Sequence, residues 1–374
     1  MTANDDIKIC AMVPYPFDTV PGQRFRIEQW EPFLLEKGIS VDYFRFADER
    51  LIELLPKKGN IVRKSFRLLK GIGRRIRDIS RLSQYDVVYL YRTAAIVGPA
   101  IFERLIKLLG KPIVFDFDDA IFLTDTAAAN GRFGWAKFSG KTSEICRLSD
   151  HVIVGNSYLA EYAGRFNSKV TIIPSGVDTV KFKPRTDRQE SGKTIVGWTG
   201  SSTSQTHLEL FNPILQMIFA NRNDVELHVH SDREPLLPGT PFVWHRWTTE
   251  NEVEVLSSFD IGIMPIPDDE WSRGKCAMKA LLYMSLGIPA ICSDVGANRD
   301  VISHGVNGLL CNTPDDWVSS VNSLANDSEM RKLLGNAGRR TIEERFSAGR
   351  CASLFYEVVV ATLTSGAPKL TTGN

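Results

Sequence analysis

Short apolar runs recur along the whole chain, and longer amphipathic segments separate them. Runs such as residues 7–13 and 87–91 show no polar alternation, which is typical of parallel strands buried on both faces of a sheet. The same pattern starts again at residues 194–198. It predicts an α/β fold in two halves, each with its own parallel sheet. The expected strands are residues 7–13, 41–46, 87–91, 112–117, 152–156, 170–174, 194–198, 225–230, 243–247, 261–266 and 288–293, and the expected helices include 23–37, 100–109, 208–219, 251–257, 276–285, 314–324, 328–345 and 348–364.

Cations gather around one predicted helix start in the second half. Arg273, Lys275 and Lys279 fall within seven residues, next to the expected helix 276–285. A helix start presents unpaired N–H groups and partial positive charge, so it favours anions, phosphate above all. The pattern predicts a phosphate site. An ordinary strand–helix–strand unit with a solvated basic helix start is the plainer alternative.

Acidic residues lie at the end of the predicted strand 112–117. Asp116, Asp118 and Asp119 reach the carboxyl edge of the sheet, where open α/β proteins bind ligands. Carboxylates at such an edge serve as general bases, hydroxyl acceptors or metal ligands. We predict catalytic roles for Asp118 and Asp119, and capping of a helix or turn by Asp119 is the alternative.

Small hydroxyl residues follow the first strand of the second half. Gly200, Ser201, Ser202 and Thr203 precede the expected helix 208–219 and form a natural phosphate cradle. Capping of that helix by the same hydroxyl groups is an equally simple interpretation, and the two are compatible.

Residues 57–81 are strongly basic, with apolar side chains at roughly helical spacing. A basic amphipathic helix suits an anionic membrane surface. Nucleic acid is a competing partner that we do not favour, and a solvated helix packed on its domain is the plainer interpretation. Gly71 and Gly73 would weaken the helix. The cations are Lys57, Lys58, Arg63, Lys64, Arg67, Lys70, Arg74, Arg75, Arg77 and Arg81, against the single acid Asp78.

Composition restricts the possible function classes only modestly. A chain of 374 residues predicts two domains, and a net charge of +1 means that any steering of an anionic partner must come from a local patch. No run of 18 apolar residues and no signal-peptide pattern is present, so we expect a cytoplasmic protein without a spanning helix. The six scattered cysteines indicate free thiols in a reducing compartment. Residues 181–192 are the expected interdomain linker, and 127–137 an expected mobile loop.

Several motifs in a fixed order carry a family resemblance over nearly the whole chain. In this arrangement the sequence resembles glycosyltransferase family 4. The motifs are Pro174-Ser-Gly-Val-Asp178 with Phe182 and Pro184, Asp260-Ile-Gly-Ile-Met-Pro265, Lys279-Ala-Leu-Leu-Tyr-Met284 with Gly287 and Pro289, Gly305-Val-Asn-Gly308, and Gly22-Gln-Arg-Phe-Arg26 after the first strand.

The resemblance implies a GT-B fold, an α/β architecture of two facing, doubly wound Rossmann-like domains with a cleft between them. Residues 1–184 would form the acceptor-binding domain and 185–347 the donor-binding domain, while 348–374 would form a helix that crosses back to the first domain. It also implies transfer with retention of the anomeric configuration, without a cofactor or an essential metal.

The chain departs from the family pattern at its donor residues. The family usually has a pair of glutamates, and the corresponding positions here are Leu282 and a position on or near Gly274. The positions of its usual Arg and Lys lie near Trp198 and Thr203, and Asp118 stands where a His is frequent. We infer that Arg273, Lys275 and Lys279 take over the diphosphate charge, helped by backbone N–H groups. The predicted donor-binding residues are Gly22, Gly200, Ser201, Ser202, Thr203, Arg273, Lys275, Cys276, Ala277, Lys279 and Leu282; the predicted catalytic residues are Asp118 and Asp119, with no metal ligand.

The sequence thus predicts a retaining glycosyltransferase of cell-envelope or exopolysaccharide synthesis. It would move a sugar from a UDP- or GDP-sugar to a glycan or lipid-linked acceptor, in the cytoplasm and peripherally on the inner face of a membrane. The departures leave two alternatives open. One is a nucleotide-sugar epimerase or hydrolase on the same fold, and the other is a non-catalytic nucleotide-sugar-binding protein.

Overall fold

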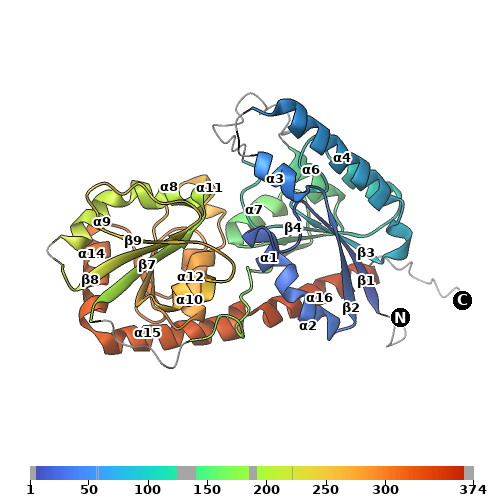
Figure 1. Ribbon diagram of the computed structural model, residues 1–374. Coiled ribbons are helices and arrows are strands. Elements are labelled where there is room, and N and C mark those ends of the chain that lie inside the picture. The colour runs from blue at the N-terminus through green and yellow to red at the C-terminus, as the bar shows by residue number, and fades with distance from the viewer. Residues whose placement is uncertain are drawn as a thin grey trace, which may run out of the picture. The chain divides into compact units, whose positions relative to one another are not determined.

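The computed structural model describes residues 6–55, 57, 59–123, 140–184, 192–220 and 222–365. They divide into two compact units (Figure 1). Unit 1 comprises Met1–Gly176 and Ala348–Asn374, and unit 2 comprises Val177–Ser347. The division thus falls before the linker expected at 181–192. The segment 185–191 of that linker and the expected loop 127–137 lie outside the described residues.

Unit 1 contains a six-stranded sheet with the order β2-β1-β3-β4-β5-β6, in which every pair is parallel. Buried apolar runs form the central strands, as expected when helices cover both faces. The strands are β1 (Ile7–Val13), β2 (Ile39–Arg45), β3 (Val87–Tyr91), β4 (Ile113–Phe117), β5 (His151–Val154) and β6 (Val170–Ile172).

Helices cover both faces of this sheet, with α4 and α16 on opposite sides (Figure 1). The expected continuous helix 23–37 is wrong. The chain forms α1, a 3₁₀ turn at Glu28–Trp30 and α2 instead, because Ile27 leaves helical geometry and Pro32 has no N–H to continue a helix. The helices of unit 1 are α1 (Pro21–Arg26), α2 (Glu31–Leu35), α3 (Glu49–Leu54), α4 (Ile61–Ile79), α5 (Ile101–Leu108), α6 (Lys141–Leu148), α7 (Ser157–Gly164) and α16 (Ala348–Ser365).

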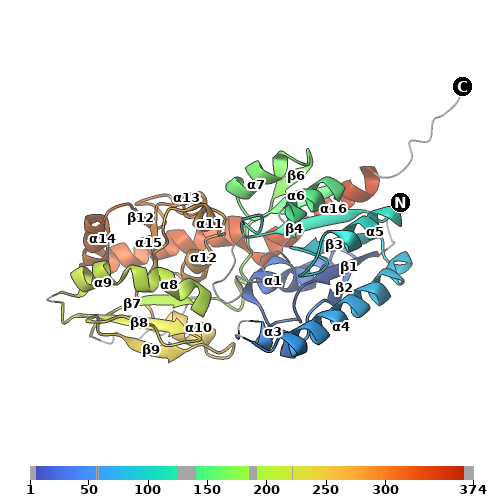
Figure 2. The same cartoon turned by 90° about the horizontal axis from the view of Figure 1, so that it is seen from above.

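The last described helix completes the core of unit 1 (Figure 2). Phe355 of α16 is fully buried, and its ring lies 5.6 Å from the Trp30 ring and 5.4 Å from the Tyr89 ring. Such edge-on and tilted aromatic pairs add to the free energy gained by burial. The C-terminal helix is therefore an integral part of unit 1.

Unit 2 contains a second six-stranded parallel sheet, with the order β12-β11-β10-β7-β8-β9. Its strands are β7 (Thr194–Gly200), β8 (Val225–Ser231), β9 (Val243–Arg246), β10 (Ile261–Met264), β11 (Ala290–Ser293) and β12 (Leu309–Cys311). The strand β12 was not expected, because its three residues are too few to give a pattern.

Two expected helices of unit 2 differ from the prediction, whereas those at 314–324 and 328–345 begin at the expected residues. The expected helix 208–219 is two helices, and the first starts at Ser202. The expected helix 276–285 starts at Met278, because Ala277 has a left-handed backbone with φ of 53°. The helices are α8 (Ser202–Leu210), α9 (Asn212–Phe219), α10 (Glu252–Ser257), α11 (Glu270–Arg273), α12 (Met278–Ser285), α13 (Asn298–Val301), α14 (Pro314–Asn326) and α15 (Ser328–Thr341), followed by a π-helical turn at Ile342–Phe346.

Candidate functional site

A tyrosine ties α12 to the carboxyl ends of two strands in unit 2. The Tyr283 hydroxyl oxygen accepts a hydrogen bond from the Thr199 N–H at 2.9 Å and donates one to the Ile263 carbonyl at 3.3 Å. The ring packs directly on Gly262, where any Cβ would collide with it. These contacts hold the first turn of α12 next to the end of β7.

Lys279 lies on that first turn and contacts an aromatic ring at the end of β7. Its ε-amino nitrogen lies 5.3 Å from the centroid of the Trp198 ring, within the range of a cation–π interaction. Burial, and then the nearby Lys275, lower the pKa of Lys279 to about 7, while Cys292 opposes the shift. An anion placed beside Lys279 would therefore raise this pKa, so that Lys279 becomes fully protonated and pairs with the anion.

His207 on α8 belongs to the same cluster. Burial, and then Lys275 and Lys279, lower the pKa of His207 to about 4, so its ring is neutral at pH 7. The buried Nδ1 of His207 and the buried indole nitrogen of Trp198 have no hydrogen-bond partner among the described residues. Buried polar atoms without partners are uncommon in folded proteins, and a bound ligand is one physical explanation for them.

The other two predicted contributors near α12 are placed differently from the expectation. Arg273 lies on the separate short helix α11, and its Nε donates to Asp268 at 2.7 Å. The N–H of Lys275 donates to the Ser272 carbonyl at 3.1 Å. The Lys275 ammonium lies 5.7 Å from the Trp271 ring.

The remaining residues of this group have distinct roles. Ala277 occupies the N-cap position of α12 in a left-handed conformation, a strained arrangement for a residue with a Cβ. Cys276 is partly buried. Leu282 is buried and offers only apolar atoms, so it cannot bind ribose hydroxyls as a glutamate would.

The loop after β7 contacts an acid that the sequence did not reveal, Asp232 directly after β8. The Ser202 N–H at the start of α8 donates to the Asp232 carboxylate at 2.5 Å, and the Ser201 and Thr203 hydroxyl oxygens lie 2.7 Å apart. A carboxylate at a helix start accepts hydrogen bonds from the same N–H groups as a phosphate would, and it interacts as favourably with the helix dipole. The loop geometry therefore favours helix capping by Asp232 over a phosphate at Ser202.

Gly200 has a packing role in the same loop. A Cβ at this position would lie 2.5 Å from the Ser204 hydroxyl and from the Trp198 ring. The residue thus lets the loop turn tightly over Trp198, next to Lys279.

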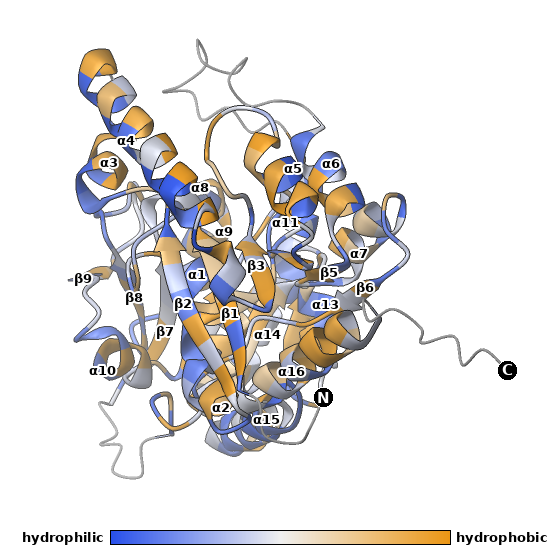
Figure 3. Ribbon diagram, turned by 90° about the vertical axis from the view of Figure 1, so that its right-hand side faces the viewer, coloured by the Kyte–Doolittle hydropathy of each residue, from blue (hydrophilic) through white to orange (hydrophobic). Residues whose placement is uncertain are grey.

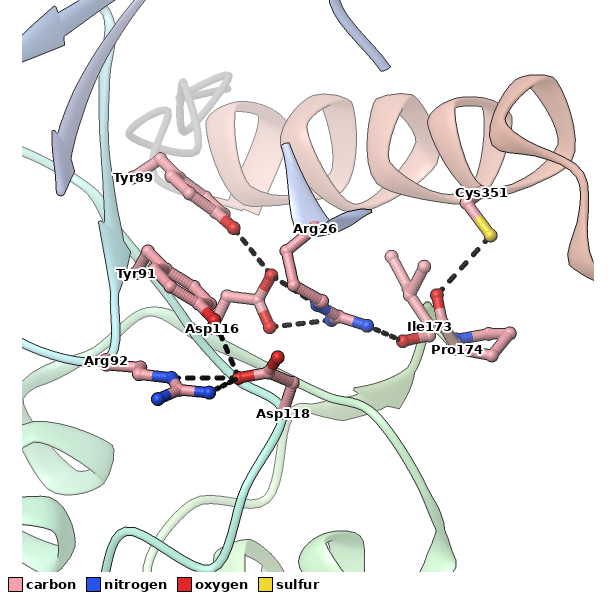
Figure 4. Close-up of polar contacts among 9 residues, drawn as sticks. All are labelled: Arg26, Tyr89, Tyr91, Arg92, Asp116, Asp118, Ile173, Pro174 and Cys351. Atoms are coloured by element: carbon pink, nitrogen blue, oxygen red, sulfur yellow. Dashed lines mark hydrogen bonds and ion pairs between the residues drawn. The ribbon is translucent and has the colours of Figure 1, made fainter. Parts of the chain in front are cut away.

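In unit 1, Asp116 of β4 and Asp118 just after it fall on one face of the sheet, because side chains alternate along a strand. Asp116 is fully buried and forms a two-point ion pair with Arg26, with Nε–Oδ2 at 3.1 Å and Nη2–Oδ1 at 2.6 Å (Figure 4). The Tyr89 hydroxyl donates to the same carboxylate at 2.6 Å, and Arg26 also donates to the Ile173 carbonyl. The Arg26–Asp116 pair therefore has hydrogen-bond partners within unit 1, and it holds α1 against the sheet.

Asp118 lies at the edge of that sheet with partners of its own (Figure 4). Its Oδ1 accepts hydrogen bonds from the Tyr91 hydroxyl at 2.9 Å and from Arg92 at 2.9 Å and 2.7 Å. Arg92 also pairs with Asp119. Burial alone would raise the pKa of Asp118, but Arg92 and Arg26 outweigh it and lower that pKa. Asp118 is therefore a carboxylate at neutral pH, suited to electrostatic or orienting work rather than to proton donation.

Gly22 lies beside this carboxylate, in unit 1 and among the predicted catalytic residues rather than among the donor residues of unit 2. A Cβ on Gly22 would lie 2.5 Å from the Tyr91 hydroxyl and 3.0 Å from Asp118 Oδ2. Arg92 itself has a left-handed backbone, with φ of 60°. Non-glycine residues in this conformation often cluster at functional sites.

The structure thus brings the predicted residues together in two groups, one in each unit. Unit 1 holds Gly22, Asp118 and Asp119, and unit 2 holds the others. Sequence reasoning missed Tyr91, Arg92, His207 and Asp232, because no motif marks them. Within the described ranges, no three His, Cys, Asp or Glu side chains are grouped so that they could hold a metal ion. The same part of the chain contains no helix that is long and apolar enough to cross a membrane.

Comparison with known proteins identifies the type of unit 2. Residues 193–327 match the family model described as "Glycosyl transferases group 1". Unit 2 therefore resembles a glycosyl transferases group 1 domain over most of its length.

Among curated proteins, the chain is similar to sulfoquinovosyl transferase SQD2 of Arabidopsis thaliana. The two are 23% identical over 364 residues, which cover 88% of this chain and 69% of that protein. The similarity therefore extends over both units.

Solved structures show the same fold. Sucrose-phosphate synthase from Thermosynechococcus elongatus matches with a TM-score of 0.69 and 15% identity, over 96% of this chain and all (100%) of that chain. HepE of Anabaena, solved with UDP-glucose, matches with a TM-score of 0.65 and 14% identity, over 95% of this chain and 100% of that chain. The predicted α/β fold, with two Rossmann-like parallel-sheet domains of the GT-B type, is confirmed. The matched family model and the similarity to sulfoquinovosyl transferase SQD2 support glycosyltransferase activity.

Proposed function

We propose that this protein is a retaining glycosyltransferase that moves a sugar from a UDP- or GDP-sugar to a glycan or lipid-linked acceptor without an essential metal. Donor binding is assigned to unit 2 and acceptor binding to unit 1. Synthesis of cell-envelope polysaccharide or exopolysaccharide, in the cytoplasm at the inner face of a membrane, is the proposed setting.

The cluster around Lys279 is the observation that carries this proposal. Lys279 packs on Trp198, and Lys275 lies close enough to lower the pKa values of both Lys279 and the neutral His207. Two ammonium groups and two unpartnered ring nitrogens are suited to the oxygens of a nucleoside diphosphate. HepE, whose match spans both units, was solved with UDP-glucose, which supports a UDP-sugar as the first donor to test.

These groups supply the chemistry that a departing nucleoside diphosphate requires. Charge builds on the leaving phosphate as its bond to the sugar breaks, and preorganised cations stabilise that charge, with about 10²–10³ in rate lost per contact removed. Lysine side chains can provide this stabilisation in the role that a divalent metal plays in other transferases. Their positions support metal-independent transfer.

Asp118 is proposed to stabilise the reacting sugar. The bond from the sugar to the diphosphate breaks as the bond to the acceptor hydroxyl forms, and positive charge develops on the sugar ring. A carboxylate held ionised by Arg92 would oppose that charge. Asp119, paired with the same Arg92, would maintain the orientation of the guanidinium.

Nucleotide binding tests the donor site directly. A thermal-shift screen with UDP, GDP, ADP, CMP and their sugars should show stabilisation by one nucleotide and its sugar, of roughly 2.7 kcal/mol at about 100 times the Kd. Lys279→Met should abolish the shift. Lys332→Met is the matched control, because Lys332 is an exposed lysine paired with Glu329 in the same unit. Equal shifts in both variants would contradict the assignment of Lys279.

Incubation with the donor alone distinguishes the chemical alternatives. A transferase should leave most of the donor intact until an acceptor is added, whereas an epimerase or hydrolase should convert it without one. Binding without turnover on any pair of donor and acceptor would instead indicate a non-catalytic nucleotide-sugar-binding protein.

A further inference from the structure

The helix α4 has an inner face that is fixed to unit 1. Arg75 is fully buried and donates hydrogen bonds to the carbonyls of Phe44 at 2.9 Å and Ala94 at 2.7 Å. Gly71 lies directly on Phe46, so that a Cβ would come within 2.8 Å of its ring. The helix runs without a break from Ile61 to Ile79, and Gly71 allows this close packing instead of interrupting it.

Several cations of the basic segment 57–81 form ion pairs or hydrogen bonds within unit 1 on this inner side of α4. Arg67 and Arg74 pair with Asp48, at 2.7 Å and 3.8 Å. The Lys64 ammonium donates to the carbonyls of Leu55 and Lys57. With Arg75, these side chains have structural roles and contribute little to an outer charged surface.

The outer face of α4 carries an apolar stripe. Val62, Phe66, Leu69 and Ile76 are 83%, 56%, 64% and 60% exposed. Their spacing of three, four and seven residues places them along one side of a helix. Figure 3 shows the hydrophobic and hydrophilic segments alternating along α4. Exposing this much contiguous apolar surface is costly unless a partner covers it.

A basic ridge runs beside the apolar stripe. Arg63, Lys70 and Arg77 are exposed and lie seven residues apart, so they line up about 10 Å from one another along the helix axis. The Lys70 ammonium lies 4.7 Å from the Phe66 ring, which places cation and apolar stripe in contact. The single acid of α4, Asp78, is buried and paired with Arg75 at 3.3 Å.

We propose that this outer face of α4 binds the surface of an anionic lipid bilayer. Val62, Phe66, Leu69 and Ile76 would enter the boundary between headgroups and acyl chains, and Arg63, Lys70 and Arg77 would contact lipid phosphates. An apolar stripe bordered by cations is the pattern of helices that lie in the plane of a membrane. Nucleic acid would match the cations alone and leave the aliphatic stripe exposed to water. This inference does not depend on the transferase activity.

Sedimentation of the full-length protein with vesicles tests the proposal. Wild type should bind vesicles of phosphatidylglycerol and phosphatidylcholine and should not bind vesicles of phosphatidylcholine alone. The triple variant Arg63→Gln, Lys70→Gln, Arg77→Gln should bind about a hundredfold more weakly, because each basic side chain near an anionic surface contributes about a fivefold factor. The control Arg104→Gln, Lys107→Gln, Arg165→Gln removes the same charge from exposed positions on α5 and directly after α7. It should bind much more tightly than the α4 variant.

A second pair of variants tests the apolar stripe. Phe66→Ser with Leu69→Ser should reduce vesicle binding at least tenfold, because two large side chains no longer enter the bilayer. Leu108→Ser with Leu109→Ser on the α5 side of unit 1 is the matched control and should bind like wild type. All of these positions are exposed, so melting temperatures should stay close to that of wild type.

Three outcomes would overturn the proposal. The first is wild-type protein that stays in the supernatant with anionic vesicles at low salt. The second is equal vesicle binding by the α4 variants and their controls. The third is binding of single-stranded RNA that depends on the ridge cations but not on Phe66 or Leu69, without binding to vesicles, which would assign the surface to nucleic acid.

Discussion

The ε-amino group of Lys279 lies over the indole ring of Trp198, 5.3 Å from its centroid. The aromatic face stabilises the ammonium form, but burial and the neighbouring Lys275 disfavour it more strongly, and the resulting pKa is about 7. The other titratable groups around it do not restore the charge. The pKa of His207 is lowered to about 4, so its ring is neutral, and burial raises the pKa of Cys292, so its thiol is neutral.

Nucleoside diphosphate affinity should therefore depend on pH through Lys279. Above pH 7 this lysine is neutral in the free protein, and a bound diphosphate would favour its protonated form, so binding takes up a proton. We expect the Kd to rise by up to about tenfold per pH unit between pH 7 and 9. Calorimetric titration in buffers of different ionisation enthalpy measures the proton uptake.

Lys279→Arg is the matched control for this pH dependence, because a guanidinium stays charged over the whole range. Its affinity should be nearly constant from pH 7 to 9. A wild-type Kd that does not change over the same interval would contradict a role for Lys279 in binding the diphosphate.

Tyr283→Phe should loosen the connection between α12 and the end of β7. The substitution removes the acceptor of the Thr199 N–H, and a buried N–H without a partner costs about 1–3 kcal/mol of stability. Chemical denaturation should show this loss, and nucleotide affinity should fall as well because Lys279 is no longer held in place. Tyr356→Phe, on α16 in unit 1, is a control that should leave nucleotide binding unchanged.

How far the sequence predicted this fold depends on the length and purity of each pattern. The strands β1 and β3 match the predicted residues at both ends, because both are almost entirely apolar and are followed at once by a residue that breaks the pattern, Pro14 or Arg92. The expected helix 23–37 is wrong because its amphipathic period continues through Ile27, where the backbone leaves helical geometry, and a new helix begins only just before Pro32. The strand β12 has three residues and takes its conformation from pairing with β11, which is a tertiary contact.

The candidate site was predictable only where it falls within a local motif. Lys275 and Lys279 stand out because cations are close together in the sequence. Arg92 and Asp118 are 26 residues apart and meet because β3 and β4 are adjacent in the sheet. Asp232 reaches the start of α8 across 30 residues for the same kind of reason. Such partners follow from sheet order, which the periodicity of a single sequence does not specify.

Asp118→Asn should separate catalysis from donor binding. The amide keeps the shape of the side chain but removes the charge that we propose to oppose the developing positive charge on the sugar. We expect transfer to fall by about 10²–10³, while nucleotide affinity stays within about twofold of wild type. Because the pKa of Asp118 is lowered, its carboxylate stays ionised as the pH falls until well into the acid range, and the wild-type rate should show no Asp118 titration above about pH 5.

The stability of the Asp118 variants checks the structural alternative. Asp118→Ala leaves Arg92 paired with Asp119, and a modest loss of stability is expected. If Asp118→Asn melts at the wild-type temperature and still loses transfer, the catalytic interpretation holds. If both variants unfold unit 1, Asp118 has a structural role instead.

Two glycines of α4 should respond in opposite ways to alanine. Gly73 faces open space, and Gly73→Ala should stabilise the protein by about 0.5–1 kcal/mol because alanine restricts the unfolded chain and favours a helix. Gly71→Ala should destabilise it, because the new methyl group would come within 2.8 Å of the Phe46 ring and push the helix off the sheet. Denaturant titration of both variants measures the difference. Equal effects of the two substitutions would mean that α4 does not pack on Phe46 as described.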